Sequence, residues 1–168
     1  MKTVISDTNI FIDLIELEIF EGLFQLPLKI KTTDFVVNVE LDEVKQAVIL
    51  QAALQKKINI IESSAEEMLE IEQIFNEVTK LSFTDTSVYY YAKNEKAILL
   101  SGDGGLRKFA EKKKLEVRGI IWVFDLLDEH NIYSRKILVE KMEKLLEINS
   151  RLPKKECEKR IKKWSKNV

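Results

Sequence analysis

Four acidic side chains stand where regular elements are expected to begin or end. They are Asp7, Glu40, Asp85 and Asp103. Asp7 and Asp103 follow short apolar runs of the kind that form buried strands, and Asp85 opens a helix rich in tyrosine. In open α/β sheets the carboxyl ends of parallel strands meet at one edge, and ligands bind there. We therefore expect the four carboxylates to line one cleft.

Such a cluster predicts a bound cation and a hydrolytic chemistry. Two carboxylates about 4 Å apart repel each other by roughly 4 kcal/mol at an effective dielectric constant of about 20. Four of them together are costly unless a cation lies between them, and hard oxygen ligands favour Mg²⁺ or Mn²⁺. These ions lower the pKa of a bound water and neutralise charge on a phosphate, so the pattern favours metal-dependent phosphodiester hydrolysis.

Each acid also has a purely structural explanation, which the residues alone leave open. Asp7 is suited to cap the helix that follows it. Asp85 lies three positions after Ser82, which is the spacing of a capping pair. Asp103 lies in a Gly-rich turn, where Asp is common.

The second acid is the most ambiguous of the four. Glu40 is followed closely by Asp42 and Glu43, and the sequence leaves open which of the three faces the cleft. The ordered set is nevertheless more informative than any single member, because four accidental placements at the ends of elements are improbable.

The elements that would position these acids alternate between strand and helix. Strands are expected near residues 3–6, 30–33, 59–61, 97–100 and 115–117. Apolar residues at helical spacing lie between them, and a capping box at 64–67 opens one helix. This alternation predicts an α/β fold whose central parallel sheet is covered by helices on both faces. Right-handed crossovers would bring the carboxyl ends of all strands to one edge.

The C-terminal part of the chain has a different character. No strand is expected beyond residue 132, and we expect a domain over residues 1–132 with a basic helical extension, 133–168, packed on or next to it. Residues 134–168 carry twelve Lys and Arg against five Asp and Glu, a net charge of +7, whereas residues 1–133 carry −8. This asymmetry indicates either a polyanionic partner or docking of the extension on the acidic body. Trp164 is expected to anchor the extension.

Composition bounds the remaining function classes. The chain has 168 residues, of which 45% are hydrophobic and 33% charged, as in an ordinary globular protein with one core. A single Cys and a single His exclude an internal disulfide and any site that needs several such ligands. The apolar run at 120–124 is far too short to cross a bilayer. We expect no membrane partner and no signal peptide, and a location in the reducing cytoplasm.

Four short segments together resemble the motifs of the PIN-domain nucleases, and in particular VapC-type toxin ribonucleases. They read SDTN at 6–9, VEL at 39–41, LSFTD at 81–85 and LSGD at 100–103. The resemblance covers roughly residues 1–128. It implies a three-layer α/β/α fold and an Mg²⁺- or Mn²⁺-dependent endoribonuclease that cleaves single-stranded RNA.

The resemblance also implies roles for individual residues. The catalytic, metal-binding acids would be Asp7, Glu40, Asp85 and Asp103, with Asn9 and Ser101 in support. Many relatives carry a further acid or Asn after the last Asp, whereas residues 104–107 read GGLR, so we expect a second metal ion to be weakly held or absent. Many relatives are toxins held inactive by an antitoxin, which makes an antitoxin an expected partner. A homodimer is a further expectation.

The basic extension lies outside the resembling region. We predict that its basic side chains contact the RNA backbone or a partner, and that salt weakens contacts to phosphates. The candidates singled out for RNA contact are Lys154, Lys155, Arg160 and Lys163.

Two other functions are alternatives to the nuclease. A haloacid-dehalogenase-type phosphatase needs a second Asp two positions after the first, and that position is Asn9. A degenerate nuclease fold that only binds RNA or protein is disfavoured by the intact set of acids, because an inactive site has no reason to tolerate their repulsion.

Overall fold

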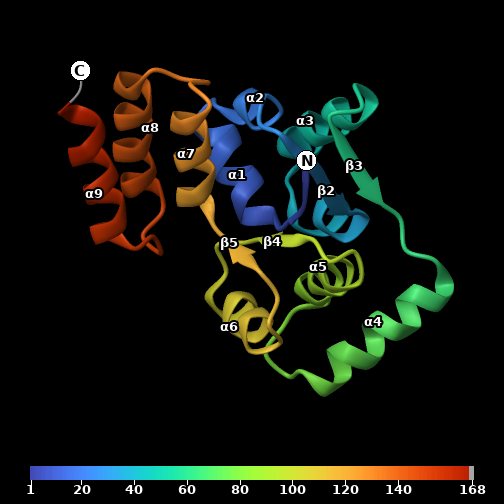
Figure 1. Ribbon diagram of the computed structural model, residues 1–168. Helices are drawn as coiled ribbons and strands as arrows, with labels where there is room; N and C mark the ends of the chain where they lie inside the picture. The colour runs from blue at the N-terminus through green and yellow to red at the C-terminus, as the bar shows by residue number, and fades with distance from the viewer. Residues whose placement is uncertain (167–168) are drawn as a thin grey trace.

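A computed structural model describes residues 1–166, which form a parallel sheet between two layers of helices (Figure 1). The strands are β1 (Lys2–Ser6), β2 (Leu28–Thr33), β3 (Ile58–Ile61), β4 (Ile98–Leu100) and β5 (Val117–Arg118). They are hydrogen-bonded in the order β3-β2-β1-β4-β5, and every neighbouring pair is parallel. This confirms the predicted fold class. β5 begins at Val117, where the sequence pattern placed the end of that strand.

Helices cover both faces of this sheet. They are α1 (Thr8–Glu16), α2 (Phe20–Leu23), the π-helix η1 (Val36–Glu40), α3 (Glu43–Leu54), α4 (Ala65–Glu77), α5 (Phe83–Asn94), α6 (Gly104–Lys112), α7 (Ile120–Glu129), α8 (Arg135–Ile148) and α9 (Lys154–Ser165). Figure 1 shows α1, α2 and α7 on one side of the sheet and α5 and α6 on the other, with α4 packed on α5. The arrangement is the predicted three-layer α/β/α fold.

The strand order creates a switch point at the centre of the sheet. After β1 the chain builds β2 and β3 outward on one side, and it then returns to build β4 and β5 on the other side of β1. Connections therefore leave the carboxyl ends of β1 and β4 in opposite directions, which opens the crevice where such sheets bind ligands. Asp7 follows β1 and Asp103 lies three positions after β4, so both acids lie at this crevice.

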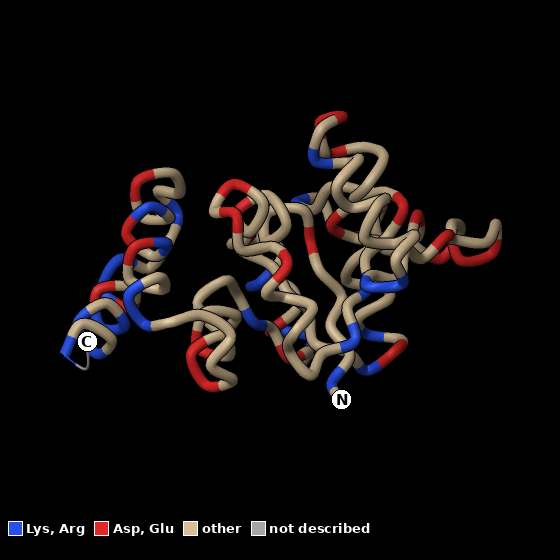
Figure 2. Tube along the Cα trace, turned by 90° about the horizontal axis from the view of Figure 1, so that it is seen from above, with Lys and Arg blue, Asp and Glu red and all other residues tan. Residues whose placement is uncertain are grey.

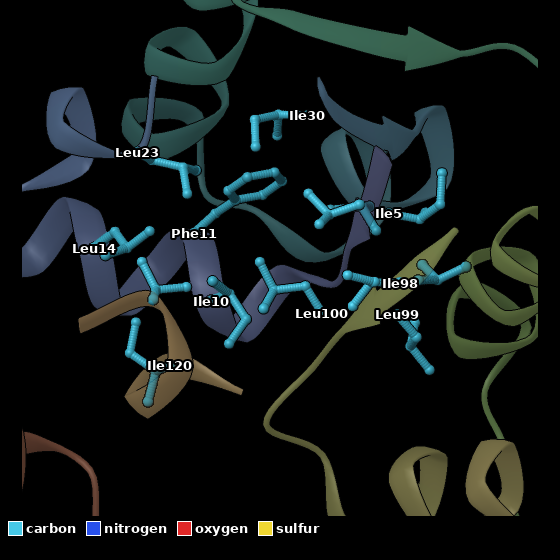
Figure 3. Packing of buried hydrophobic residues seen from close by; sticks show 14 of the residues in the cluster. Ile5, Ile10, Phe11, Leu14, Leu23, Ile30, Ile98, Leu99, Leu100 and Ile120 are labelled. Carbon is cyan, nitrogen blue, oxygen red and sulfur yellow. The ribbon is translucent and has the colours of Figure 1, made fainter. Parts of the chain in front are cut away.

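Packing on both faces explains why the central strands are apolar throughout. Val4 and Ile5 point to opposite faces of β1, yet both are fully buried because helices cover both faces. Figure 3 shows Ile10 and Phe11 of α1 packed over the sheet beside Leu100 of β4. The start of α1, immediately after Asp7, is therefore held against the sheet.

The basic extension folds as α8 and α9, which pack on α7. Trp164 is fully buried, as expected of an anchor, and stacks on Phe124 of α7 with ring centroids 6.3 Å apart and planes 22° apart. Nε of Arg135 donates to Oδ1 of Asp128 at 2.8 Å, so part of the positive charge neutralises acids of the body. Figure 2 shows the Lys and Arg residues gathered along these two helices.

Residues 167–168, which close the predicted unit 133–168, lie outside the described residues. The division into a domain and an extension stays a prediction. Across residues 1–166, the helices are all too short or too polar to cross a membrane.

Candidate active site

Asp7 is the most enclosed acid of the crevice. It caps α1 by accepting the Thr8 N–H at Oδ1 (2.7 Å), and its Oδ2 accepts the hydroxyl of Ser101 at 2.8 Å. Its own N–H donates to the carbonyl of Leu100 at 2.9 Å, which ties it to β4. Only 1% of Asp7 is exposed. The helix cap and the strand-end position are therefore both real, and neither excludes the other.

The electrostatic setting of Asp7 is unusual for a carboxyl group. Burial raises the pKa of Asp7 from an ordinary value of 3.8 to about 7, although the hydrogen bond from Ser101 opposes this increase. The negative charges of Asp85 and Glu40 make smaller contributions to the same increase in pKa. A carboxyl group held near two others favours a proton or a cation beside it.

Glu40 is brought to the crevice by a hydroxyl group that the sequence analysis did not single out. Oγ1 of Thr8, the first residue of α1, donates to Oε2 of Glu40 at 2.5 Å. Glu40 ends the π-helix, an irregular form that is often found at functional sites. Its neighbour Asp42 instead caps α3 and pairs with Lys45 at 2.8 Å. Of these two acids, Glu40 is the one tied to the crevice.

Asp85 completes the set from α5. Its Oδ2 accepts the N–H of Ser82 at 3.2 Å, and Oγ of Ser82 accepts the N–H of Asp85 at 3.0 Å, so the pair is a capping box. Burial raises the pKa of Asp85, and the negative charges of Asp103 and Glu40 add to the effect. The capping box thus fixes the Asp85 side chain at the start of α5.

Asp103 is the N-cap of α6 and is half-buried. Its Oδ1 accepts the N–H of Leu106 at 2.8 Å, and its own N–H donates to Oγ of Ser101 at 3.1 Å. Ser101 therefore holds both Asp7 and Asp103 through one hydroxyl group. Capping leaves lone pairs free on the carboxylate, because each carboxylate can accept about four hydrogen bonds or ligand contacts.

A layer of buried hydroxyl groups lies behind the acids, and the sequence analysis missed it. Oγ1 of Thr32 donates to the carbonyl of Ser6 at 2.8 Å, and Oγ1 of Thr33 lies 3.0 Å from Oγ of Ser87. All of these residues are buried. The available signal was the pair of threonines at the carboxyl end of β2, Thr32 and Thr33. This layer satisfies backbone groups where β1 and β2 end.

The donor set fits a hard divalent cation. The crevice gathers carboxylate and hydroxyl oxygens, which suit Mg²⁺ or Mn²⁺. Within residues 1–166, no three acidic, His or Cys side chains already form a cage around one point. Mg²⁺ is commonly held by only one or two carboxylates together with waters and substrate phosphates, so a complete protein cage is not required. The roles of the four acids as metal ligands stay a prediction.

The predicted supporting and RNA-binding residues fall in different places. Asn9 is half-buried at the start of α1, beside the crevice. On α9, the Arg160 guanidinium binds Asp125 through two contacts of 2.9 and 3.0 Å, so it is occupied within the fold. Lys163 lies 3.9 Å from Asp128. Lys154 and Lys155 are exposed at the start of α9.

Comparisons with known proteins give one family model and several similar solved structures. A family model described as a PIN domain matches residues 3–166, a range that includes α8 and α9. Among solved structures, PAE2754 from Pyrobaculum aerophilum is similar at 14% sequence identity and a TM-score of 0.49, over 73% of this chain and 92% of that one. FitAcB from Neisseria gonorrhoeae is similar at 14% identity and a TM-score of 0.40, over 68% of this chain and 95% of that one. No curated protein matches.

Proposed function

Because this chain belongs to the PIN-domain family, we propose that it is a metal-dependent endoribonuclease that cleaves single-stranded RNA. PIN domains are generally nucleases and typically use divalent metal ions. The single observation that carries the proposal is the linkage of the acids at the end of the sheet: Ser101 bonds both Asp7 and Asp103 through one hydroxyl group, and the charges of Asp85 and Glu40 add to the raised pKa of Asp7. A bound Mg²⁺ or Mn²⁺ would supply an activated water and would neutralise charge on the phosphate.

The chain's own residues have distinct tasks in this proposal. Asp7 and Asp103 would hold the ion most directly, and Ser101 fixes both of them through its hydroxyl group. Asp85 and Glu40 would complete the site, directly or through water. Glu40 is the exposed member, and its bond to Thr8 would hold it in place to orient the attacking water.

We propose two partners besides RNA, on the strength of the resemblance. The protein would act as the toxin of a toxin–antitoxin pair, held inactive by an antitoxin, and it would form a homodimer. A small open reading frame next to the gene would support the antitoxin proposal, and its absence would argue against that proposal. Measurement of the molecular mass in solution tests the second.

The central experiment compares cleavage of a single-stranded RNA by the wild type and Asp7→Asn in the presence of Mn²⁺. We expect the substitution to lower the rate by about a hundredfold or more, since even groups that only support a metal ligand are worth about 10- to 100-fold. The matched control is Asp42→Asn, because Asp42 is an acid near Glu40 that caps α3, and Asn also caps helices well.

The control variant should cleave RNA as the wild type does. Calorimetric titration with Mn²⁺ adds a readout that is independent of cleavage, and Asp7→Asn should weaken this binding. Equal cleavage by the wild type and Asp7→Asn would overturn the proposed mechanism.

A further inference from the structure

A cleft of about 550 Å³ opens beside the acid crevice and reaches the C-terminal extension. Its near end is formed by Asn9, Gly102 and Gly104, which flank Asp7 and Asp103 in the chain. Its far end is formed by the turn between α8 and α9, including Arg151 and Leu152. The extension therefore supplies one wall of a cavity whose other end lies at the proposed catalytic centre.

Arg107 of α6 stands at the near end of this cleft. Its Nη1 donates to the carbonyl of Ser101 at 2.9 Å, which fixes the guanidinium next to the acids. Gly119 makes room for this contact, because a Cβ at that position would lie 3.1 Å from Nη1. About a third of the side chain is exposed, and its Nη2 lies 3.8 Å from Oε1 of Glu111, so its charge is partly balanced by that acid. A guanidinium has five N–H donors, so donors are left for a ligand in the cleft.

Arg151 stands at the far end, on a turn that is tied to the body. Oδ1 of Asn149 accepts the N–H of Arg151 at 3.1 Å, and Nδ2 of Asn149 donates to Oδ2 of Asp13 on α1 at 3.0 Å. Asp13 is itself buried. In the part of the chain that the structure describes, no carboxylate lies within ion-pair distance of the exposed Arg151. Among residues 1–166 its charge is therefore not paired, unlike that of Arg160.

The rest of the lining suits a nucleotide. Ile12, Ile121 and Ile148 give the cleft an apolar wall against which a base can pack. Glu16 at the rim lies 3.8 Å from Lys45, so its negative charge is partly balanced. The volume lies within the range of about 300–1,000 Å³ that is common for ligand pockets. Two arginines with an apolar surface between them match the alternation of phosphates and bases in a single strand.

We propose that this cleft is a strand-binding subsite in which a nucleotide flanking the scissile phosphate of single-stranded RNA is held, with its phosphates contacted by Arg107 and Arg151. This inference rests on the proposed nuclease function and adds to it. It assigns RNA contact to the turn between α8 and α9, whereas the sequence pattern predicts contacts by side chains along α9.

The test measures binding of a fluorescent single-stranded RNA to the full chain in EDTA, by anisotropy, over a range of salt concentrations. We expect Arg151→Gln to weaken binding about tenfold. The slope of log Kd against log salt should fall by about 0.7, the value for one lost phosphate contact on a single strand. Arg107→Gln should weaken binding as well. The matched control is Lys144→Gln, which removes one charge from an exposed position of α8 outside the cleft and should change neither quantity.

Parallel Mn²⁺ cleavage assays separate the two proposals. If the wild type cleaves RNA but Arg151→Gln binds as tightly as the wild type, or if Lys144→Gln weakens binding equally, the cleft is not the subsite and the nuclease proposal stands. If the wild type neither binds nor cleaves single-stranded RNA, both proposals fall. Thermal unfolding of each variant confirms that the fold is retained.

Discussion

The acid crevice and the C-terminal helix pair use charge in opposite ways. In the crevice, like charges are brought together: Asp7 is buried near Asp85 and Glu40, and burial together with this repulsion raises its pKa to about 7. In the helix pair, opposite charges meet, as in the contact between Arg160 and Asp125 at 2.9 Å. Like charges held close together indicate a binding site in the crevice, because a ligand or cation can relieve their repulsion. Paired opposite charges indicate that the helix pair is docked on the body.

The turn between α8 and α9 shares features of the crevice and of the helix pair. It belongs to the docked extension, yet Arg151 is exposed toward the cleft that leads to the acids. The net charge of a segment therefore predicts little about its role until the partners of its individual side chains are known.

Trp164→Ala tests whether the helix pair is an integral part of the core. Trp164 is fully buried against Phe124, so truncation should lower the free energy of unfolding by about 3–5 kcal/mol. Urea unfolding followed by circular dichroism measures this. Trp122→Ala is the matched control, because Trp122 is only half-buried on the same helix, α7, and its loss should cost less. A separate early transition for α8 and α9 would show instead that they are an independent appendage.

Ser101→Ala tests the shared support of the crevice. The change removes the donor to Asp7 and the acceptor for the Asp103 N–H, so we expect a drop in the RNA cleavage rate of about 10- to 100-fold. The control is Ser64→Ala, which removes an equivalent capping hydroxyl group from α4, away from the acids. It should cost about 1 kcal/mol of stability and leave cleavage unchanged. Wild-type cleavage by Ser101→Ala would separate the crevice from catalysis.

Asp13→Asn tests the link between α1 and the turn. Burial raises the pKa of Asp13 from 3.8 to about 6, against the hydrogen bond from Asn149, and the charge of Glu16 adds to the increase. The folded state therefore binds the proton more tightly than the unfolded state, and this contribution to stability is full below about pH 4 and is lost as the pH rises through 6. An Asn side chain keeps an oxygen for Asn149 and carries no charge.

The variant should accordingly be more stable than the wild type at pH 7, and the difference should vanish near pH 4. Melting temperatures between pH 4 and pH 7 measure it. A difference that stays constant over this range would show that the Asp13 carboxyl group does not titrate as its burial requires.

Much of the fold was predictable because it depends on local patterns. Apolar β-branched runs form the strands, and the spacing of Ser64 and Glu67 forms a capping box, as expected. The strand whose bounds were predicted least accurately is β5. It has only two residues, Val117 and Arg118, so its sequence pattern is too short to place its ends. The structural explanations for Asp7 as a helix cap and for Asp85 as the partner of Ser82 in a capping pair were also correct, because capping depends on residues within three positions.

Residue types and their spacing along the chain were enough to indicate a parallel α/β sheet, an acidic crevice at its edge and the anchoring role of Trp164. The tertiary structure alone tied Glu40, rather than Asp42, to the crevice, because the hydroxyl group of Thr8, 32 positions earlier, donates a hydrogen bond to it. It also paired Arg160 with Asp125 while leaving Arg151 at a cleft whose opposite wall is α1. Such contacts join residues far apart in the chain, so they depend on how the layers pack and not on any local pattern.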